Sequence, residues 1–371
     1  MKLSSRSDRV SVSGIRKVFE LAASIEDPID LSIGQPDFSV PDIGKDAAHK
    51  AIDEGFTRYT LTQGIPELRN KVKDYYKDLH GVEFDESLVT SGVAGAVLLA
   101  FFSLLEEGDE ILIPDPAFML YEQWANFLGA KTVRYNTYPD FRAYPERIES
   151  AITDRTKLLI VLSPSNPTGA VLPDNDIRKI AEIAKKHDLL VLSDEIYDRF
   201  TYDSEPTSIC RYYDNVLCMG GYSKFAGMPG MRLGYALGNE ELIGCMRKLQ
   251  QFSFVCAPSV SQKIGVAMLD ADFTPTLERY RRKRDIIYDG LKDNFDVEKP
   301  GGAFYIFPKA PWGTGTEFAE HAIKNKVLII PGGQFSAQDT HFRLSFASDD
   351  ATLHKGIEAL NRLAKEPPSN I

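Results

Sequence analysis

A lysine among small residues is the first candidate for chemistry in this chain of 371 residues. Lys224 stands in the sequence GYSKFAGMPGMRLGY, and a second cation, Arg232, follows eight residues later. Small neighbours allow a flat molecule to approach the lysine. Burial or a nearby positive charge would lower the lysine pKa enough for it to form a Schiff base. A solvated lysine in a glycine-rich loop is the alternative that the motif alone leaves open.

An acidic residue at the end of an apolar run is the second candidate. Asp194 closes the run LLVLSD, and Tyr197 follows three residues later. A buried carboxylate at a strand end can keep a pyridine nitrogen protonated, which makes the ring an electron sink. A tyrosine at this spacing can donate a hydrogen bond to a phenolic oxygen on the same ring. The alternative is a strand that ends in an ordinary acidic turn.

Two more residues follow apolar runs and suit the edge or the face of a ring. Asn166 opens the turn NPTG after KLLIVLSPS, where a turn and an amide contact with a ring are compatible. Phe118, in PDPAF, could lie flat on a conjugated ring. A single aromatic side chain is equally at home in a hydrophobic core, and that alternative stays open.

Anion binding is indicated at two places. The small residues TSGVAGA precede an apolar helix, and the free amides at such a helix start would suit an anion such as a phosphate. A plain helix start is the alternative, because the lysine and hydroxyl residues of a P-loop are missing. Arg343, in FRLSFA, would bind a carboxylate through its planar fork if its strand borders the cleft. A surface arginine is the alternative.

The histidines and cysteines carry no predicted chemistry. None of the six histidines pairs with a plausible nucleophile. The four cysteines form no CxxC pair and have no nearby histidine at zinc-ligand spacing. We therefore expect no structural metal and a reducing compartment.

Apolar runs alternate with helical patterns from about residue 46 onwards. The runs at 110–114, 157–162, 189–194 and 215–221 lack polar alternation, which is typical of strands covered on both faces. Helices are predicted at 66–80 and 173–187, and strand–helix alternation implies an α/β fold with a mostly parallel sheet. Because such sheets bind ligands beyond the carboxyl ends of their strands, the candidate residues should meet at one edge.

The sequence pattern also predicts how the chain is divided. An amphipathic helix is predicted at 14–22 and a short strand at 31–38, within an N-terminal arm (1–45) that belongs partly to a smaller domain. The large, helix-flanked domain spans 46–270. The C-terminal third, 271–371, opens with a long charged helix and completes the smaller α+β domain. The run ERYRRKRD in that helix is interpreted as a solvated face.

Composition excludes several classes of protein. With 43 Lys and Arg against 53 Asp and Glu, the net charge is −10, which argues against a broad grip on nucleic acid or anionic lipid. No apolar run reaches the length of a membrane helix, and the N-terminus lacks a signal-peptide core. A cytoplasmic protein with no nucleic-acid or membrane partner is expected.

Taken in order, these motifs resemble one family, the class-I pyridoxal-phosphate aminotransferases, and in particular the prokaryotic aspartate and aromatic amino-acid aminotransferases. The resemblance covers essentially the whole chain, from SGIRKVFELA and IGQPDF through RYTLTQGIPELR, PDPAF, SPSNPTG, SDEIY and GYSKFAGMPGMRLGY to GGAFYIF, PGGQF and FRLSFA. It implies pyridoxal 5′-phosphate as cofactor, a homodimer, and ping-pong transamination between an amino acid and 2-oxoglutarate.

The resemblance also implies a role for each matching residue. Lys224 forms the Schiff base, Asp194 pairs with the pyridine nitrogen, Tyr197 and Asn166 bind the ring oxygen, and Phe118 stacks on the ring. The phosphate is held by Ser223, Arg232 and the amides of Val93 and Ala94, with Tyr59 reaching the phosphate of the neighbouring subunit. Arg343 binds the substrate α-carboxylate, helped by Asn166 and the Gly34 backbone. Two residues depart from the pattern: Gly221 replaces a phosphate-binding serine of some members, and Met231 replaces a frequent tryptophan.

The reaction and the donor are left open at two points. The same lysine chemistry supports β-elimination of cysteine conjugates or cystathionine, and a cofactor-sensing module fused to a DNA-binding head is a remote third class. The donor is expected to be aspartate or an aromatic amino acid, with kynurenine, alanine and glutamine still possible. Discrimination depends on the far wall of the pocket, which should include the Ile15–Phe19 region. The positions of Arg16 and Lys17 there are not predicted.

Overall fold

A seven-stranded sheet dominates the described part of the chain. The structure, a computed structural model of the chain, describes residues 3–15, 18, 20 and 25–367. The strand order in the sheet is β2-β8-β7-β6-β5-β3-β4. Only β8 runs opposite to the other six strands, so the predicted α/β fold with a mostly parallel sheet is confirmed. The strands are β2 (Glu86–Thr90), β3 (Glu110–Asp115), β4 (Lys131–Asn136), β5 (Thr156–Leu162), β6 (Leu190–Asp194), β7 (Val216–Gly221) and β8 (Gly234–Gly238).

Helices cover both faces of this sheet. Successive strand residues alternate between two hydrophobic cores, as Leu158 and Leu159 do, because neighbouring side chains of a strand point to opposite faces. One core also contains side chains of α3 (Pro66–His80), α6 (Pro145–Ala151), α7 (Asp174–Lys186) and α9 (Ser259–Met268). The other contains side chains of α4 (Gly92–Leu104), α5 (Leu120–Leu128) and α8 (Glu240–Ser253). The helices predicted at 66–80 and 173–187 are therefore confirmed as α3 and α7.

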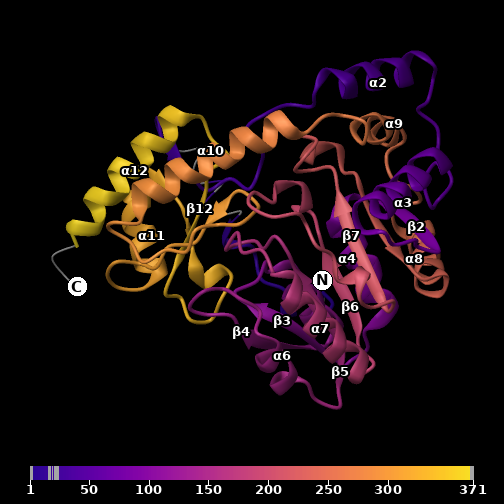
Figure 1. Cartoon of the computed structure of the whole chain (residues 1–371), viewed down its shortest axis with the longest axis horizontal. Coiled ribbons are helices and arrows are strands. Elements are labelled where there is room, and N and C mark those ends of the chain that lie inside the picture. Colours follow the sequence, from indigo (N-terminus) through magenta and orange to yellow (C-terminus); the bar gives the residue numbers. More distant parts are fainter. Residues whose placement is uncertain (1–2, 16–17, 19, 21–24, 368–371) are drawn as a thin grey trace.

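Smaller sheets lie beside the large one and join the two ends of the chain. Strand β1 (Ile29–Asp30) pairs in parallel with β10 (Val327–Leu328), whereas β11 (Ile330–Pro331), β12 (Phe342–Ser345) and β9 (Tyr305–Ile306) form an antiparallel sheet. Helices α10 (Thr274–Leu291), α11 (Gly315–Lys324) and α12 (Asp350–Lys365) surround them at the left of Figure 1. The domain boundaries after residues 45 and 270 stay a prediction.

The remaining elements are short or lie near the N-terminus. Helix α2 (Asp42–Asp53) packs against α9, at the top right of Figure 1. Of the helix predicted at 14–22, Gly14, Ile15, Val18 and Glu20 are helical, whereas Arg16, Lys17 and Phe19 lie outside the described residues. The strand predicted at 31–38 is wrong in position, since β1 ends at Asp30. Single 3₁₀ turns occur at η1 (Ser7–Arg9), η2 (Asp198–Phe200), η3 (Ile209–Arg211), η4 (Pro229–Met231) and η5 (Gly332–Gln334).

The interpretation of residues 278–285 as a solvated helix face is wrong. Lys283 and Arg284 of α10 are almost fully buried. Lys283 forms an ion pair with Asp37, and its Nζ donates a hydrogen bond to the Ser348 carbonyl at 2.6 Å. Arg284 forms an ion pair with Asp203. Since buried cations require such partners, α10 is fixed both to the loop after β1 and to the segment after β6.

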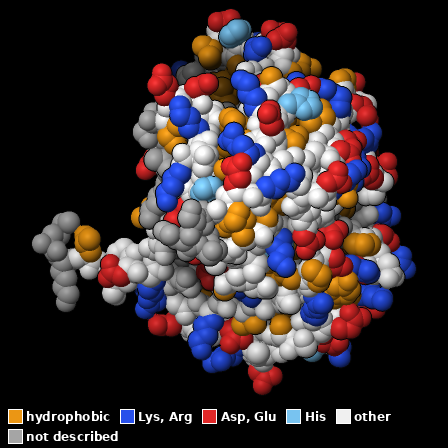
Figure 2. Space-filling model, turned by 90° about the vertical axis from the view of Figure 1, so that its left-hand side faces the viewer, with side chains coloured by type: hydrophobic (Ala, Val, Ile, Leu, Met, Phe, Trp, Pro, Cys, Tyr) orange, Lys and Arg blue, Asp and Glu red, His pale blue; other side chains and the backbone are white. Residues whose placement is uncertain are grey.

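Acidic and basic side chains are mixed on the face of the molecule that Figure 2 shows. That face lies on the side of α10, α11 and α12. No helix within the described ranges combines the length and the apolar character needed to cross a membrane. Those ranges also contain no group of three or more His, Cys, Asp or Glu residues arranged to hold a metal ion.

Candidate active site

The candidate residues follow the strands of the large sheet at one edge. Strands β3, β5, β6 and β7 are parallel, so the segments after their carboxyl ends meet there. Strand β8 runs the other way, which places its amino end, just after Arg232, at the same edge. Strand β2 is antiparallel to β8 and delivers the start of α4 there. This is the position at which open α/β sheets bind ligands.

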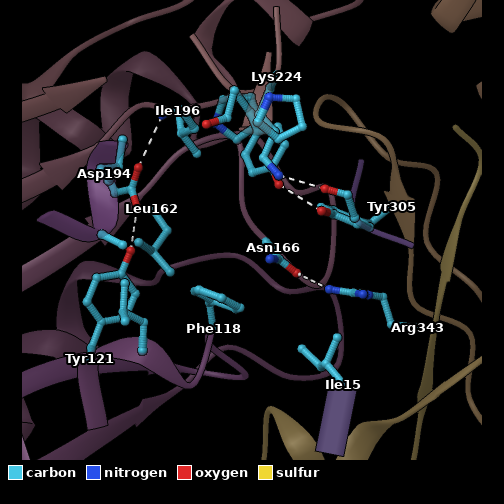
Figure 3. A pocket seen from close by; sticks show the side chains of 18 of the residues that line it. Ile15, Phe118, Tyr121, Leu162, Asn166, Asp194, Ile196, Lys224, Tyr305 and Arg343 are labelled. Carbon is cyan, nitrogen blue, oxygen red and sulfur yellow. Dashed lines mark hydrogen bonds between the residues drawn. The ribbon is translucent and has the colours of Figure 1, made fainter. Parts of the chain in front are cut away.

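A cavity of about 380 Å³ lies at this edge and brings together every predicted site residue except Tyr59. Figure 3 shows Asp194 and Tyr121 on one side of it, Asn166 and Arg343 on the other, and Lys224 between them. Ile15 lines the cavity as expected of the far wall. The predicted residues among its lining are Gly34, Val93, Ala94, Phe118, Asn166, Asp194, Tyr197, Ser223, Lys224, Arg232 and Arg343.

Tyr59 lies outside the cavity of its own chain. Its side chain is 84% exposed, in the segment between α2 and α3. The Tyr59 side chain therefore does not take part in the site of its own chain. Its predicted contact with the phosphate of a neighbouring subunit stays a prediction.

The Lys224 amine lies in the interior of the cavity. Its Nζ donates a hydrogen bond to the Gly34 carbonyl oxygen at 2.6 Å. Burial lowers the pKa of Lys224, and the nearby cations Arg343 and Arg232 lower it further. Tyr305 and Asp194 oppose this shift. A buried amine with a lowered pKa has a larger neutral fraction, which is the form that attacks a carbonyl carbon.

Asp194 is held by donors on both of its carboxylate oxygens. The hydroxyl of Tyr121 donates to Oδ2 at 2.5 Å, and the backbone amide of Ile196 donates to Oδ1 at 3.1 Å. Burial raises the pKa of Asp194, whereas these two hydrogen bonds and the charge of Lys224 lower it. A buried carboxylate supported in this way can bind a protonated ring nitrogen.

Backbone amides and an arginine converge at the start of α4, in the lining of the same cavity. Helix α4 begins at Gly92, and its N-cap residue, Ser91, makes no side-chain capping hydrogen bond. Arg232 lies against this helix start, with Nη1 bonded to the Pro229 carbonyl at 2.9 Å. A Cβ atom at Gly92 would lie 2.7 Å from Arg232 Nη2, so the close approach requires glycine. Amides at a helix start together with a guanidinium form an anion site.

Gly221 and Met231 are the two residues that depart from the family pattern. Gly221 is the last residue of β7, and a Cβ atom there would lie 3.2 Å from Gly234 Cα, Ile196 Cδ1 and the Leu233 carbonyl. Space for a larger side chain is therefore tight. Met231 is 41% exposed and does not line the cavity.

Arg343 is fully buried on β12 and is presented from the smaller sheet. Its Nη1 donates to Asn166 Oδ1 at 3.0 Å and its Nη2 to the Ser32 carbonyl at 2.9 Å. The Nε atom has no hydrogen-bond partner among the described residues. The guanidinium lies over the rings of Tyr305 and Phe335, at 4.5 and 5.0 Å from their centroids. An arginine held flat in this way is oriented to bind a carboxylate.

Tyr121 and Tyr305 are site residues that sequence reasoning missed. Tyr121 lies in the first turn of α5, three residues after Phe118, and that closeness in sequence was the available indication. Tyr305 bonds to Tyr197, with the hydroxyl oxygens 2.8 Å apart. Tyr305 lies in the segment GGAFYIF, and no pattern in that segment predicts that it lies near the large sheet. Other lining residues that were not predicted are Leu120, Leu162, Pro164, Ile196 and Pro229.

Known proteins resemble this chain over nearly its whole length. Residues 26–360 match the family model of class I and II aminotransferases. A probable aspartate aminotransferase of Methanocaldococcus jannaschii is 37% identical, covering 97% of this chain and 99% of the relative. An aromatic-amino-acid aminotransferase 2 of Thermococcus litoralis is 35% identical, covering 99% of both chains. The structure of an aspartate aminotransferase from Thermus thermophilus with maleate superposes with a TM-score of 0.94 at 32% identity, covering 98% of this chain and all of that one.

These similarities agree with the strand order and the cavity at the sheet edge. The chain belongs to the class I and II aminotransferase family, and it is an enzyme of that class. The resemblance that the motifs indicate is thereby confirmed.

Proposed function

We propose that the enzyme transfers the amino group of an L-amino acid, of the aspartate or aromatic type, to 2-oxoglutarate by a ping-pong mechanism with pyridoxal 5′-phosphate as cofactor. The observation that carries the proposal is the buried Lys224 amine between Asp194 and Arg343. The names of the similar proteins, which include aspartate and aromatic-amino-acid aminotransferases, support the donor class.

The donor set of the cavity fits such a cofactor. A phosphate suits the start of α4, where Gly92 lets Arg232 approach the free amides and Ser223 adds a hydroxyl. A basic ring nitrogen suits Asp194, whose two hydrogen bonds keep the carboxylate in place. Phe118 lines the same cavity and would suit the ring face. Tyr197 and Asn166 would serve the ring oxygen.

Each residue then has a defined task. Pyridoxal phosphate supplies an aldehyde that captures the amino group and a ring that spreads the negative charge left when the α-proton departs. Lys224 Nζ, whose pKa is lowered by burial, would accept that proton and donate it again. Asp194 would keep a proton on the ring nitrogen. Arg343, which lines the cavity, would hold the α-carboxylate and so orient the α-hydrogen toward Lys224.

A homodimer is part of the proposal. Apolar side chains are exposed next to the anion end of the cavity, in a patch formed by Tyr59, Leu61, Phe252, Phe254 and Val255. Gln250 joins its two segments, because its Nε2 donates to the Thr62 carbonyl at 2.6 Å. A second copy of the chain would cover this patch, and Tyr59 would then reach the phosphate of that copy.

A visible-absorbance titration tests the reaction. Purified enzyme with pyridoxal phosphate should lose its cofactor band on addition of aspartate or phenylalanine and regain it with 2-oxoglutarate, while Lys224→Ala should not respond. Release of pyruvate with an unchanged band would instead identify a β-lyase acting on cysteine conjugates. Failure of the wild-type chain to take up the cofactor would refute the proposal.

Mixing two variants tests the shared site. Lys224→Ala and Tyr59→Ala homodimers should each be nearly inactive. If Tyr59 serves the neighbouring subunit, a hybrid dimer contains one complete site, so an equal mixture should recover about a quarter of wild-type activity. No recovery after subunit exchange, shown to occur by light scattering of tagged subunits, would contradict the shared arrangement.

A further inference from the structure

Tyr121 is a buried residue of the site to which the roles above give no task. Its side chain is 1% exposed, in the first turn of α5, and packs in the hydrophobic core on one face of the sheet. Its hydroxyl donates a hydrogen bond to Asp194 Oδ2 at 2.5 Å. Phe118, three residues earlier, lines the same cavity, so a single short segment presents both side chains.

The hydrogen bond changes what Asp194 can do. Burial makes the Asp194 carboxylate more basic than an exposed one, because charge is unfavourable in an apolar surrounding. Tyr121 is the strongest of the groups that counter this effect, followed by the Ile196 amide and the charge of Lys224. If the carboxylate were too basic, it would take the proton of a bound pyridinium and leave the ring neutral. A donated hydrogen bond opposes that transfer.

We propose that Tyr121 is a positioning residue of the reaction: its hydroxyl fixes the orientation of Asp194 and moderates the basicity of that carboxylate, so that the shared proton stays on the pyridine nitrogen of the cofactor. No proton is gained or lost by Tyr121 itself, which remains a neutral donor. The inference rests on the proposed function, since it concerns the nitrogen of pyridoxal phosphate.

The burial of Tyr121 supports a neutral donor. Burial raises its pKa well above the ordinary tyrosine value, and the neighbouring Asp194 charge raises it further. The hydroxyl therefore keeps its proton at neutral pH, and Asp194 keeps its donor.

A conservative substitution and a matched control separate this role from packing. Tyr121→Phe removes one oxygen atom and leaves the ring. Tyr135→Phe removes the same atom from another buried tyrosine, on β4 of the same sheet, whose hydroxyl donates to the Ile160 carbonyl at 3.3 Å and does not line the cavity. Thermal unfolding of both variants reports the cost of losing a buried hydroxyl. Dissociation constants for the cofactor report the proposed role.

Binding is measured for the cofactor and for an analogue that lacks the ring nitrogen. Protein fluorescence gives the dissociation constant of pyridoxal 5′-phosphate and of its carbocyclic analogue, in which CH replaces the ring nitrogen. Losing a hydrogen bond to a charged group costs about 1.5–3 kcal/mol, so Tyr121→Phe should weaken pyridoxal phosphate binding by about 10- to 100-fold. The analogue should bind Tyr121→Phe and wild type within about twofold, because it offers Asp194 no nitrogen. Tyr135→Phe should bind both forms like wild type.

Different failures point to different errors. Equal weakening of both cofactor forms by Tyr121→Phe, or no weakening of either, would overturn the role of Tyr121 while leaving the proposed reaction intact. If wild-type enzyme binds neither form, the proposed function itself fails. If Tyr121→Phe does not fold, Tyr121→Leu and Tyr121→Met, which also lack a donor, replace it, and the inference requires that each discriminate between the two cofactor forms less well than wild type.

Discussion

The hydroxyl groups of Tyr197 and Tyr305 lie 2.8 Å apart, in a hydrogen bond that joins the segment after β6 to β9 of the smaller sheet. Burial raises the pKa of Tyr197 well above the ordinary value, and Tyr305 adds to that shift, so the Tyr197 hydroxyl stays protonated. The Tyr305 ring also lies under Arg343. One residue of the smaller sheet thus supports both Tyr197, the proposed cofactor contact, and Arg343, the proposed substrate contact.

Gly34 is expected to tolerate no side chain because of Tyr305. A Cβ atom at Gly34 would lie 2.5 Å from the Tyr305 hydroxyl, but 3.5 Å from the next ring atom. Gly34→Ala should therefore push Tyr305 away from Tyr197 and lower kcat/KM by about tenfold or more, a loss of about 1.4 kcal/mol. The double variant Gly34→Ala/Tyr305→Phe should be no worse than Tyr305→Phe alone. Additive losses in steady-state kinetics would contradict this steric explanation.

The candidate site was predictable where the residues follow strands of one sheet. Asn166 and Lys224 follow β5 and β7, and Asp194 is the last residue of β6. The carboxyl ends of parallel strands lie at the same edge of a sheet, so these residues could be placed together from the sequence. Tyr305 was not predictable, because its place depends on how the antiparallel sheet docks beside the large one. No local pattern encodes that docking.

Arg343 is expected to act on substrate binding alone. Replacing it by Gln removes the charge proposed to hold the α-carboxylate, so kcat/KM for amino acids should fall by about 100- to 1,000-fold, or about 3–4 kcal/mol. The dissociation constant of pyridoxal phosphate should remain within about twofold of wild type. Arg282→Gln, at an exposed arginine of α10 paired with Asp350, is the control and should leave both constants unchanged. A parallel loss of cofactor affinity in Arg343→Gln would indicate a general collapse of the site.

The bounds predicted for β3, β5, β6, β7, α3 and α7 lie within one or two residues of the observed ones, but the burial of charge was not predictable. In ERYRRKRD the charged residues recur at nearly every position, which is typical of a solvated helix. Lys283 and Arg284 are buried because distant acids, Asp37 and Asp203, meet them. Those acids lie more than eighty residues away in one case and more than two hundred in the other, so only the tertiary structure reveals the pairs.

Asp37 is therefore expected to contribute more to the free energy of unfolding than an acid in an exposed ion pair. Asp37→Asn leaves the Lys283 ammonium buried without its counter-charge, which should lower the free energy of unfolding by about 3–5 kcal/mol. Asp289→Asn on the same helix breaks only an exposed pair with Lys292 and should cost about 0.5 kcal/mol or less. Urea denaturation of both variants checks the contrast. Similar losses would show that the Asp37–Lys283 pair is no stronger than a surface pair.

Glu195, next to Asp194, is expected to make stability depend on pH. Its buried carboxylate accepts hydrogen bonds from Tyr76, Ser193 and Ser208, on the side of the sheet away from Tyr121. Burial raises the pKa of Glu195 to about 7, although these three donors counter the shift. The unfolded chain has the ordinary carboxyl pKa, so between about pH 4.5 and 7 the folded state binds more protons. The contribution of Glu195 to stability therefore falls as pH rises through this window.

A neutral isostere isolates this contribution from other titrating groups. Burial lowers the pKa of His80 and of His341 to about 4, which makes stability rise over part of the same range, but both histidines are present in wild type and variant. Glu195→Gln removes only the carboxyl titration. Its unfolding free energy minus that of wild type should increase by about 3 kcal/mol at most between pH 5 and 7.5, because the wild type must ionise a buried acid and the variant need not. Urea denaturation at the two pH values measures this difference. A difference that stays constant would mean that Glu195 is ionised throughout, held by its three hydrogen-bond donors.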